Sequence, residues 1–252
     1  MSFFYKKLLS TFFILIFLVG CTNKAPITNR NQFIFMSEQQ EIALGKQSYK
    51  ETLKKATLSS DTFQSNRVKR IGKRIAAVVN RTDYKWEFNL VENKAKNAFC
   101  LPGGKVVVYT GILEVAKNDS QLATVISHEI AHALARHGAE RVSMGMVSNL
   151  IGNIGNIVLG STHPQYVKTF NIAYGAGTQY GVMLPYGRMQ ESEADEIGIH
   201  LMQLSNYNIH EALNFWTNMS KNSKQSKSSF FSTHPSSQER ISNIKRIIRK
   251  IN

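Results

Sequence analysis

The spacing of apolar and polar residues predicts an α+β fold that is mostly helical. Ser37 and Gln40 form a capping box at the start of a helix that the pattern extends to Ala56. A second helix is expected over 63–81, where apolar residues recur every three or four positions. Both segments have the pattern of scaffold helices with one buried face.

A small antiparallel sheet is expected after these helices. Apolar and polar residues alternate over 86–90, which is the pattern of a half-buried strand. Two further strand-like runs, 98–101 and 105–110, flank the turn Pro102-Gly103-Gly104. The sheet is therefore predicted to contain a tight hairpin.

The rest of the chain is predicted to be helical apart from one glycine-rich stretch. Helices are expected over 121–137, which Gly138 ends, and over 189–205, 210–221 and 236–252. The stretch 144–187 is apolar and rich in glycine, but polar residues interrupt every window of 18 residues. We interpret it as a mobile covering segment, rather than as a membrane span.

The N-terminus has the anatomy of an export signal. Lys6 and Lys7 precede an apolar run of about 12 residues, which is shorter than the roughly 20 that a spanning helix needs. The end of this run, Leu18-Val19-Gly20-Cys21, resembles the lipobox of bacterial lipoproteins. We therefore expect a signal peptide over 1–20, a lipidated Cys21 with a short linker over 21–32, and one folded domain over 33–252.

Composition excludes several classes of protein. The chain has 252 residues, 42% of them hydrophobic, which is too many for a disordered or collagen-like protein. Its net charge is +14, but an exported protein is a poor candidate for nucleic-acid binding. The last helix carries isoleucines on one face and basic residues on the other. We interpret it as packed on the core with a solvated basic face, the alternative being contact with an anionic membrane.

The helix at 121–137 contains the strongest chemical signal. His128 and His132 are four residues apart and share one face, so both imidazoles can bind one zinc ion, and Glu129 between them is placed to act as general base. A catalytic zinc needs a third protein ligand, for which Glu191 is the candidate. Asp195, one turn later, can orient a ligating histidine, whereas Glu193 is predicted to be a solvated surface carboxylate.

These motifs resemble those of the gluzincin metallopeptidases of the HtpX-like and CAAX-prenyl-protease type. The segment 97–111 is similar to the edge strand of that family, and 232–235 is similar to its C-terminal motif. The resemblance implies a zincin-like fold with one Zn²⁺ per chain, held by His128, His132 and Glu191. It also implies that Asn97 and Ala98 bind substrate. His234 would either stabilise the tetrahedral intermediate or close the zinc's open position.

Within that family the chain is most similar to the lipid-anchored outer-membrane branch. Thr22, directly after the candidate lipidated cysteine, favours the outer membrane, facing the periplasm. We expect a zinc endopeptidase that cleaves misfolded or misassembled envelope proteins. The alternative is a latent, chaperone-like factor for outer-membrane proteins, whose partner would be the assembly machinery. A cell-wall amidase is a weaker third reading.

The remaining candidate groups are assigned structural roles. His137, His163, His200 and His210 have no partner spacing that points to a site. Cys100 lies in an apolar strand-like run without a nearby histidine in sequence. We interpret it as a core or edge residue, not as a thiol nucleophile.

Overall fold

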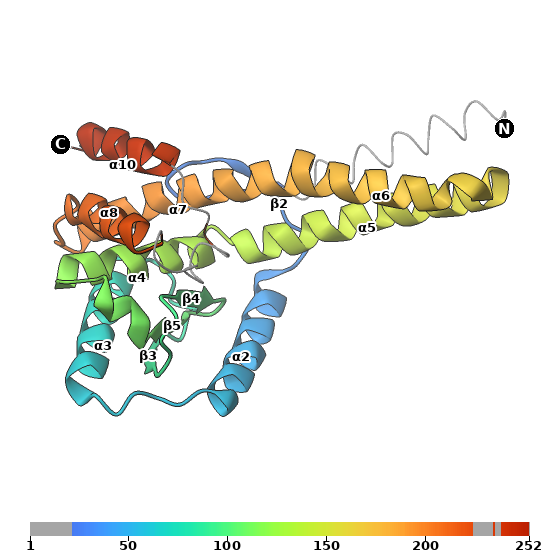
Figure 1. Ribbon diagram of the computed structural model, residues 1–252. Coiled ribbons are helices and arrows are strands. Elements are labelled where there is room, and N and C mark those ends of the chain that lie inside the picture. The colour runs from blue at the N-terminus through green and yellow to red at the C-terminus, as the bar shows by residue number, and fades with distance from the viewer. Residues whose placement is uncertain (1–21, 224–233, 235–237, 252) are drawn as a thin grey trace.

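The computed structural model describes residues 22–223, residue 234 and residues 238–251. In chain order, the elements are β1 (Thr22–Lys24), β2 (Asn31–Phe33), α2 (Glu38–Lys55), α3 (Thr62–Ala76), β3 (Glu87–Val91), β4 (Ala98–Leu101), β5 (Lys105–Tyr109), the turn η1 (Thr110–Glu114), α4 (Asp119–Leu134), α5 (His137–Thr162), the turn η2 (Pro164–Tyr166), α6 (Val167–Thr178), the π turn η3 (Gln179–Met183), α7 (Leu184–Leu204), α8 (Glu211–Ser223) and α10 (Gln238–Ile251). The predicted α+β class, mostly helical with a small sheet, is confirmed (Figure 1).

Helix α4 is the central element of the fold. Every residue of α4 from Gln121 to Ala133 is buried, because the sheet, α3, α7 and α8 all pack around it. Asn118 begins the helix by accepting a hydrogen bond from the backbone N–H of Gln121. A helix buried on all sides has no amphipathic stripe, so its polar side chains must find partners inside the protein.

The three-stranded sheet has the order β3-β5-β4. Strands β4 and β5 form the expected antiparallel hairpin, and Gly103 and Gly104 turn the chain with φ of 82° and 80°. Strand β3 lies parallel to β5, so the sheet is mixed. The order leaves β4 at an edge of the sheet, on the side that faces α4.

Two helix ends differ from the prediction. Helix α3 ends at Ala76, five residues before the predicted end, and α4 ends at Leu134, three residues before the predicted end at His137. Arg136 turns the chain between α4 and α5 in the left-handed conformation, with φ of 50°. Its guanidinium is held by the Glu41 carboxylate and the Met36 carbonyl, both at 2.7 Å, and these bonds compensate for the unfavourable backbone.

The glycine-rich stretch is not a loop. Residues 144–187 lie in α5, α6 and the beginning of α7, and α6 continues through a single π turn into α7. Figure 1 shows α5 and α6 side by side, extending well past the rest of the described chain. Helix α5 is long and apolar enough to cross a membrane, and little of it is buried. The prediction of a covering loop was therefore wrong, since helical glycines were read as breaks.

The predicted linker is also folded over its described residues. Strands β1 and β2 pair as an antiparallel hairpin, with Thr22 opposite Phe33. Ala25 in this hairpin is buried, and Arg30 reaches into the protein interior. The predicted signal peptide and Cys21 lie outside the described residues. At the other end, Ile244 and Ile248 of α10 are buried in the core, as the amphipathic pattern indicates.

We expect Gly45→Ala to destabilise the fold. A Cβ at this position of α2 would lie 2.2 Å from the Pro102 carbonyl oxygen, so α2 and the β4–β5 turn would have to separate. The expected cost is about 1–3 kcal/mol, measured as the change in the free energy of unfolding. Gly138→Ala is the matched control, because a Cβ there meets nothing within 4 Å. A loss of equal size in both variants would contradict the close contact.

Candidate metal centre

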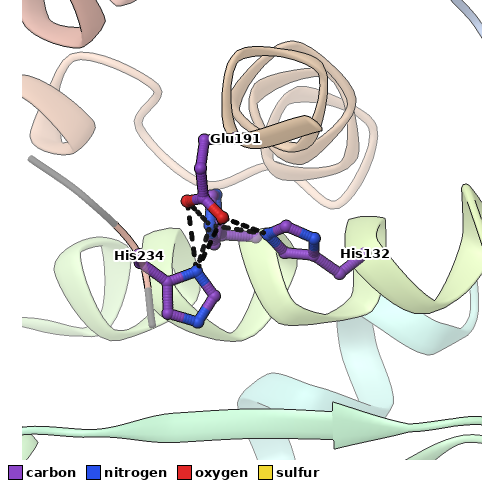
Figure 2. A group of neighbouring side chains, drawn as sticks. His132, Glu191 and His234 are labelled. Atoms are coloured by element: carbon purple, nitrogen blue, oxygen red, sulfur yellow. Dashed lines mark hydrogen bonds and ion pairs between the residues drawn. The ribbon is translucent and has the colours of Figure 1, made fainter. Parts of the chain in front are cut away.

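Four buried side chains bring their ligand atoms within 4.8 Å of one another. His128 and His132 come from α4, Glu191 from α7, and His234 from the segment before α10. Figure 2 shows the Glu191 carboxylate pointing down between the imidazoles. The structure therefore gathers all three ligands predicted from sequence, together with His234.

The spacing of these atoms fits one tetrahedral zinc ion. The two Nε2 atoms of His128 and His132 are 3.1 Å apart, and each lies 3.3 Å from an oxygen of Glu191. His234 Nδ1 lies 3.4 Å from His128 Nε2 and 3.1 Å from both Glu191 oxygens. Ligands placed tetrahedrally at zinc's usual bond length of about 2.0–2.1 Å are about 3.3 Å apart. Two imidazoles, a carboxylate and a third imidazole are also a donor set that zinc prefers.

The outer nitrogen of His128 faces Asp195, at 3.0 Å between Nδ1 and Oδ1. Burial alone would raise the pKa of Asp195, but the charge of Arg240 and the contact with His128 outweigh it, so the pKa lies below its usual value. Asp195 stays ionised and can fix the tautomer that leaves His128 Nε2 available for metal. The geometry agrees with the orienting role expected for Asp195.

Arg240 is a central residue of the site that sequence reasoning missed. Its guanidinium binds both oxygens of Asp195, at 2.7 and 2.8 Å, and one oxygen of Glu191 at 2.9 Å. It also lies 4.0 Å from the ring centroid of Trp216. Arg240 is one of the basic residues of the last helix, whose basic face is predicted to be solvated, but it is only 4% exposed. The helical pattern marks the apolar face but gives no sign that one arginine beside it meets two buried carboxylates.

The outer nitrogen of His132 is held by a second histidine. His137 Nδ1 lies 2.8 Å from His132 Nδ1, and His137 Nε2 lies 2.9 Å from a Glu193 oxygen. Glu193 is 6% exposed, so the prediction of a solvated surface carboxylate was wrong. Burial would raise the pKa of Glu193, but hydrogen bonds from His137, Arg30 and Thr28 outweigh it and hold the pKa at about 2.

The N-terminal hairpin completes this support. Arg30 bridges Glu193, at 2.9 Å from Nε, and Glu140, at 2.8 Å from each of its two terminal nitrogens. The Thr28 hydroxyl donates to the other oxygen of Glu193. A chain of polar contacts therefore runs from residues 28–30 through Glu193 and His137 to His132. Because Arg30 is remote in sequence from the histidines, no local pattern could have found it.

Glu129 lies beside the four ligand atoms without being one of them. Burial raises the pKa of its carboxyl. Its Oε1 is buried and makes no hydrogen bond within the described part of the chain, and His234 Nε2 is 3.5 Å away. An unsatisfied buried carboxylate oxygen is costly, and such atoms mark places where a polar partner binds. Its position suits a base that takes a proton from a water in the site.

The segment expected to bind substrate lies at the sheet edge. Ala98 begins the edge strand β4, and Asn97 precedes it, accepting a hydrogen bond from the Ala98 N–H. Cys100 of the same strand is half-buried, and desolvation, followed by the negative charge of Glu129, raises the pKa of its thiol. This environment disfavours a thiolate, which agrees with a structural role for Cys100. Strand β4 packs against α4, the helix that carries Glu129.

This arrangement is typical of zincin metallopeptidases. In these mostly helical domains, two crossing helices supply His, His and Glu around one ion. A family model described as peptidase family M48 matches residues 63–248. The chain belongs to peptidase family M48, whose metalloproteases use zinc. The expected gluzincin family is thereby confirmed.

Several metalloendopeptidases are similar to the chain. Mitochondrial metalloendopeptidase OMA1 of Schizosaccharomyces pombe is 34% identical over 87% of this chain and 64% of its own length. OMA1 of Arabidopsis thaliana is 36% identical over 73% of this chain and 36% of its own length. The beta-barrel assembly-enhancing protease of Escherichia coli K12 is 31% identical over 68% of this chain and 36% of its own length. The matched region thus spans less than two thirds of each of these three relatives.

We expect His137→Gln to weaken zinc binding by about 10–100-fold, because His132 loses the contact that orients its ring. Glu193→Gln should have an effect in the same direction, since it neutralises the carboxylate behind His137. Zinc affinity is measured by competition with a chelating dye. Glu196→Gln is the control, since this carboxylate lies on the same helix but takes part in none of the contacts described above. If zinc affinity is unchanged in both site variants, this chain of contacts does not support zinc binding.

Proposed function

We propose that the protein is a zinc metalloendopeptidase of the cell envelope. The observation that carries the proposal is the convergence of His128, His132 and Glu191 on one buried point, with Glu129 beside it. This arrangement provides three protein ligands and a separate base, which is what hydrolysis of a peptide bond requires. The similarity to proteins named metalloendopeptidases supports the same activity.

The chain's own residues divide the chemical work. Bound zinc supplies Lewis acidity, which polarises a carbonyl and lowers the pKa of a water. Glu129 accepts a proton from the attacking water and passes it to the leaving amine. Asp195 and His137 hold the two ligating imidazoles in their tautomers, and Arg240 keeps Asp195 ionised. The oxygen of Glu129 that has no described hydrogen bond supports its role as the base.

Peptide substrates are proposed to bind as an added strand on β4. An edge strand offers backbone N–H and C=O groups that pair with any extended chain, whatever its side chains. Asn97 and Ala98 lie where this edge begins, and β4 packs against α4, the helix that carries Glu129. Recognition through the backbone favours unfolded segments, so misfolded or misassembled envelope proteins are the proposed substrates.

His234 is proposed to keep the enzyme latent. Its Nδ1 lies 3.4 Å from His128 Nε2 and 3.1 Å from Glu191, so His234 would bind a zinc ion held there as a fourth ligand, in the position that a catalytic site leaves open for water. This geometry supports the inhibitory reading of His234 over intermediate stabilisation in the conformation described. A latent enzyme is also compatible with the alternative function, a chaperone or assembly factor that cleaves only when opened.

The location follows from the N-terminal sequence. We propose that residues 1–20 are removed and that Cys21 is acylated, which would tether the protein to the outer membrane on its periplasmic side. The similarity to the beta-barrel assembly-enhancing protease supports an envelope location and suggests assembly machinery as a partner. The OMA1 relatives carry mitochondrial names, so the comparisons point to more than one compartment.

Glu129→Gln should abolish cleavage while keeping zinc. The substitution removes the proton acceptor but leaves the three ligands intact, and both proteins should bind about one zinc per chain. We expect cleavage of unfolded casein to fall by about 100-fold or more. Zinc content is measured alongside, and a chelator should stop the parent enzyme. Equal cleavage by the two proteins would rule out Glu129 as the base, and absence of zinc from both would rule out the metal site.

His234→Ala should raise the cleavage rate, because it opens the fourth position. Casein hydrolysis at equal zinc content measures the effect. A fall of about 10²–10³-fold would instead mean that His234 stabilises the intermediate. If zinc is bound and neither the parent nor His234→Ala cleaves, the chaperone function becomes the better assignment.

A further inference from the structure

We infer that the helical hairpin over residues 142–187, made of most of α5, then η2, α6, η3 and the start of α7, inserts into a lipid bilayer. This contact is separate from the lipid anchor proposed at Cys21, and it concerns a surface that the peptidase activity does not use. Figure 1 shows the hairpin extending from the domain as two adjacent helices. Four properties of the hairpin lead to the inference.

The first property is its exposed apolar surface. Eleven of the eighteen large apolar side chains that are exposed in the described residues belong to this hairpin: Val142, Met146, Leu150, Ile151, Ile154, Ile157, Val158, Tyr166, Ile172, Tyr180 and Val182. Soluble monomers rarely leave so many large apolar side chains exposed on one projecting element. In the hydrocarbon core of a bilayer, exposing this apolar surface carries no hydrophobic free-energy cost.

The second property is the length of the uncharged zone. Neither 142–162 nor 169–187 contains Asp, Glu, Lys, Arg or His. At 1.5 Å per residue, each segment is about 30 Å long, which is the thickness of the hydrocarbon core of a bilayer. Arg141 and Arg188 flank the zone at the base, and His163 and Lys168 flank it at the tip. Basic side chains at the two ends can reach the headgroups on either side.

The third property is how the two helices pack. A Cβ at Gly155 would lie 2.4 Å from the Phe170 ring, and one at Gly152 would lie 3.1 Å from the Tyr174 ring. The Tyr174 hydroxyl donates to the Ser148 carbonyl at 2.7 Å. Small residues facing large ones, with a hydrogen bond across, are how helices associate in lipid. Uncharged amides such as Asn153 on the outer surface are tolerated there far better than charges.

The fourth property is that the N-terminal strands and the metal centre both lie near the base of the hairpin. The Phe35 N–H donates to Ser143 Oγ at the base of α5, and Phe35 is 45% exposed beside it. Thr22 pairs with Phe33, so the chain enters the fold close to this base. Glu191 lies one helical turn beyond Arg188. The insertion would therefore hold the metal centre near the headgroups, on the side from which the N-terminus enters.

The test measures the depth of single added tryptophans in the full-length protein. The protein is reconstituted in vesicles of phosphatidylethanolamine and phosphatidylglycerol that contain lipids brominated either near the glycerol or near the middle of the acyl chain. Ile151→Trp and Tyr180→Trp place the probe at mid-hairpin, and Val142→Trp places it at the base. Phe63→Trp on α3 is the control, because Phe63 is 74% exposed and outside the hairpin. The parent signal from Trp86 and Trp216 is subtracted.

We expect blue-shifted emission from the mid-hairpin probes, with most of it quenched by the deep bromines. Val142→Trp should be quenched by the shallow bromines, and Phe63→Trp by neither. Shallow quenching of all hairpin probes would mean a hairpin lying on the surface, and blue-shifted emission that no bromine quenches would mean packing against a second protein chain. Either result overturns the inference. Because the measurement involves no peptide cleavage, it can fail while the proposed function stands, or the reverse.

Discussion

The close approach of α7 to α4 is the contact on which the metal centre depends. Gly198 makes it possible, because a Cβ there would lie 3.2 Å from the His128 backbone nitrogen. With the helices this near, side chains one and two turns earlier on α7 reach the histidines of α4. Glu191 meets the inner nitrogens of both imidazoles, and Asp195 meets the outer nitrogen of His128. A wider separation would leave α7's carboxylates short of the ion.

Burying this many charges together requires internal compensation. A buried carboxylate without a partner is costly, and removing one member of a buried pair costs more than the pair contributes. Arg240 neutralises Asp195 and Glu191 from one side, and Arg30 neutralises Glu193 and Glu140 from the other. These two arginines come from opposite ends of the described chain. The metal site is therefore held by the last helix and by the N-terminal hairpin, neither of which supplies a zinc ligand itself.

Sequence reasoning located the site residues that lie close together on one helix. It missed those that reach the site only when distant segments of the chain fold together. His128, Glu129 and His132 lie within one helical turn or so, and Glu191 and Asp195 are one turn apart, so each pair could be recognised on a single helix. Arg240, Arg30 and Glu193 gain their roles only when distant segments meet. The helices of the hairpin were missed for another reason. Their glycines pack against aromatic rings across the helix pair or face outward, and a pattern alone cannot distinguish such glycines from those that break a helix.

The hairpin is built from continuations of the two helices that carry the metal ligands, and the two connections are not equivalent. Helix α5 follows α4 across a turn at Arg136, whose left-handed backbone changes the direction of the chain. Helix α6 runs into α7 through continuous helix with one π turn, so no loop separates the hairpin from Glu191. A tilt of the hairpin would therefore be transmitted to Glu191 more directly than to His132. The Glu191 carboxylate completes the ligand set. A bilayer that fixes the hairpin would therefore also favour one distance between Glu191 on α7 and the ligating histidines on α4.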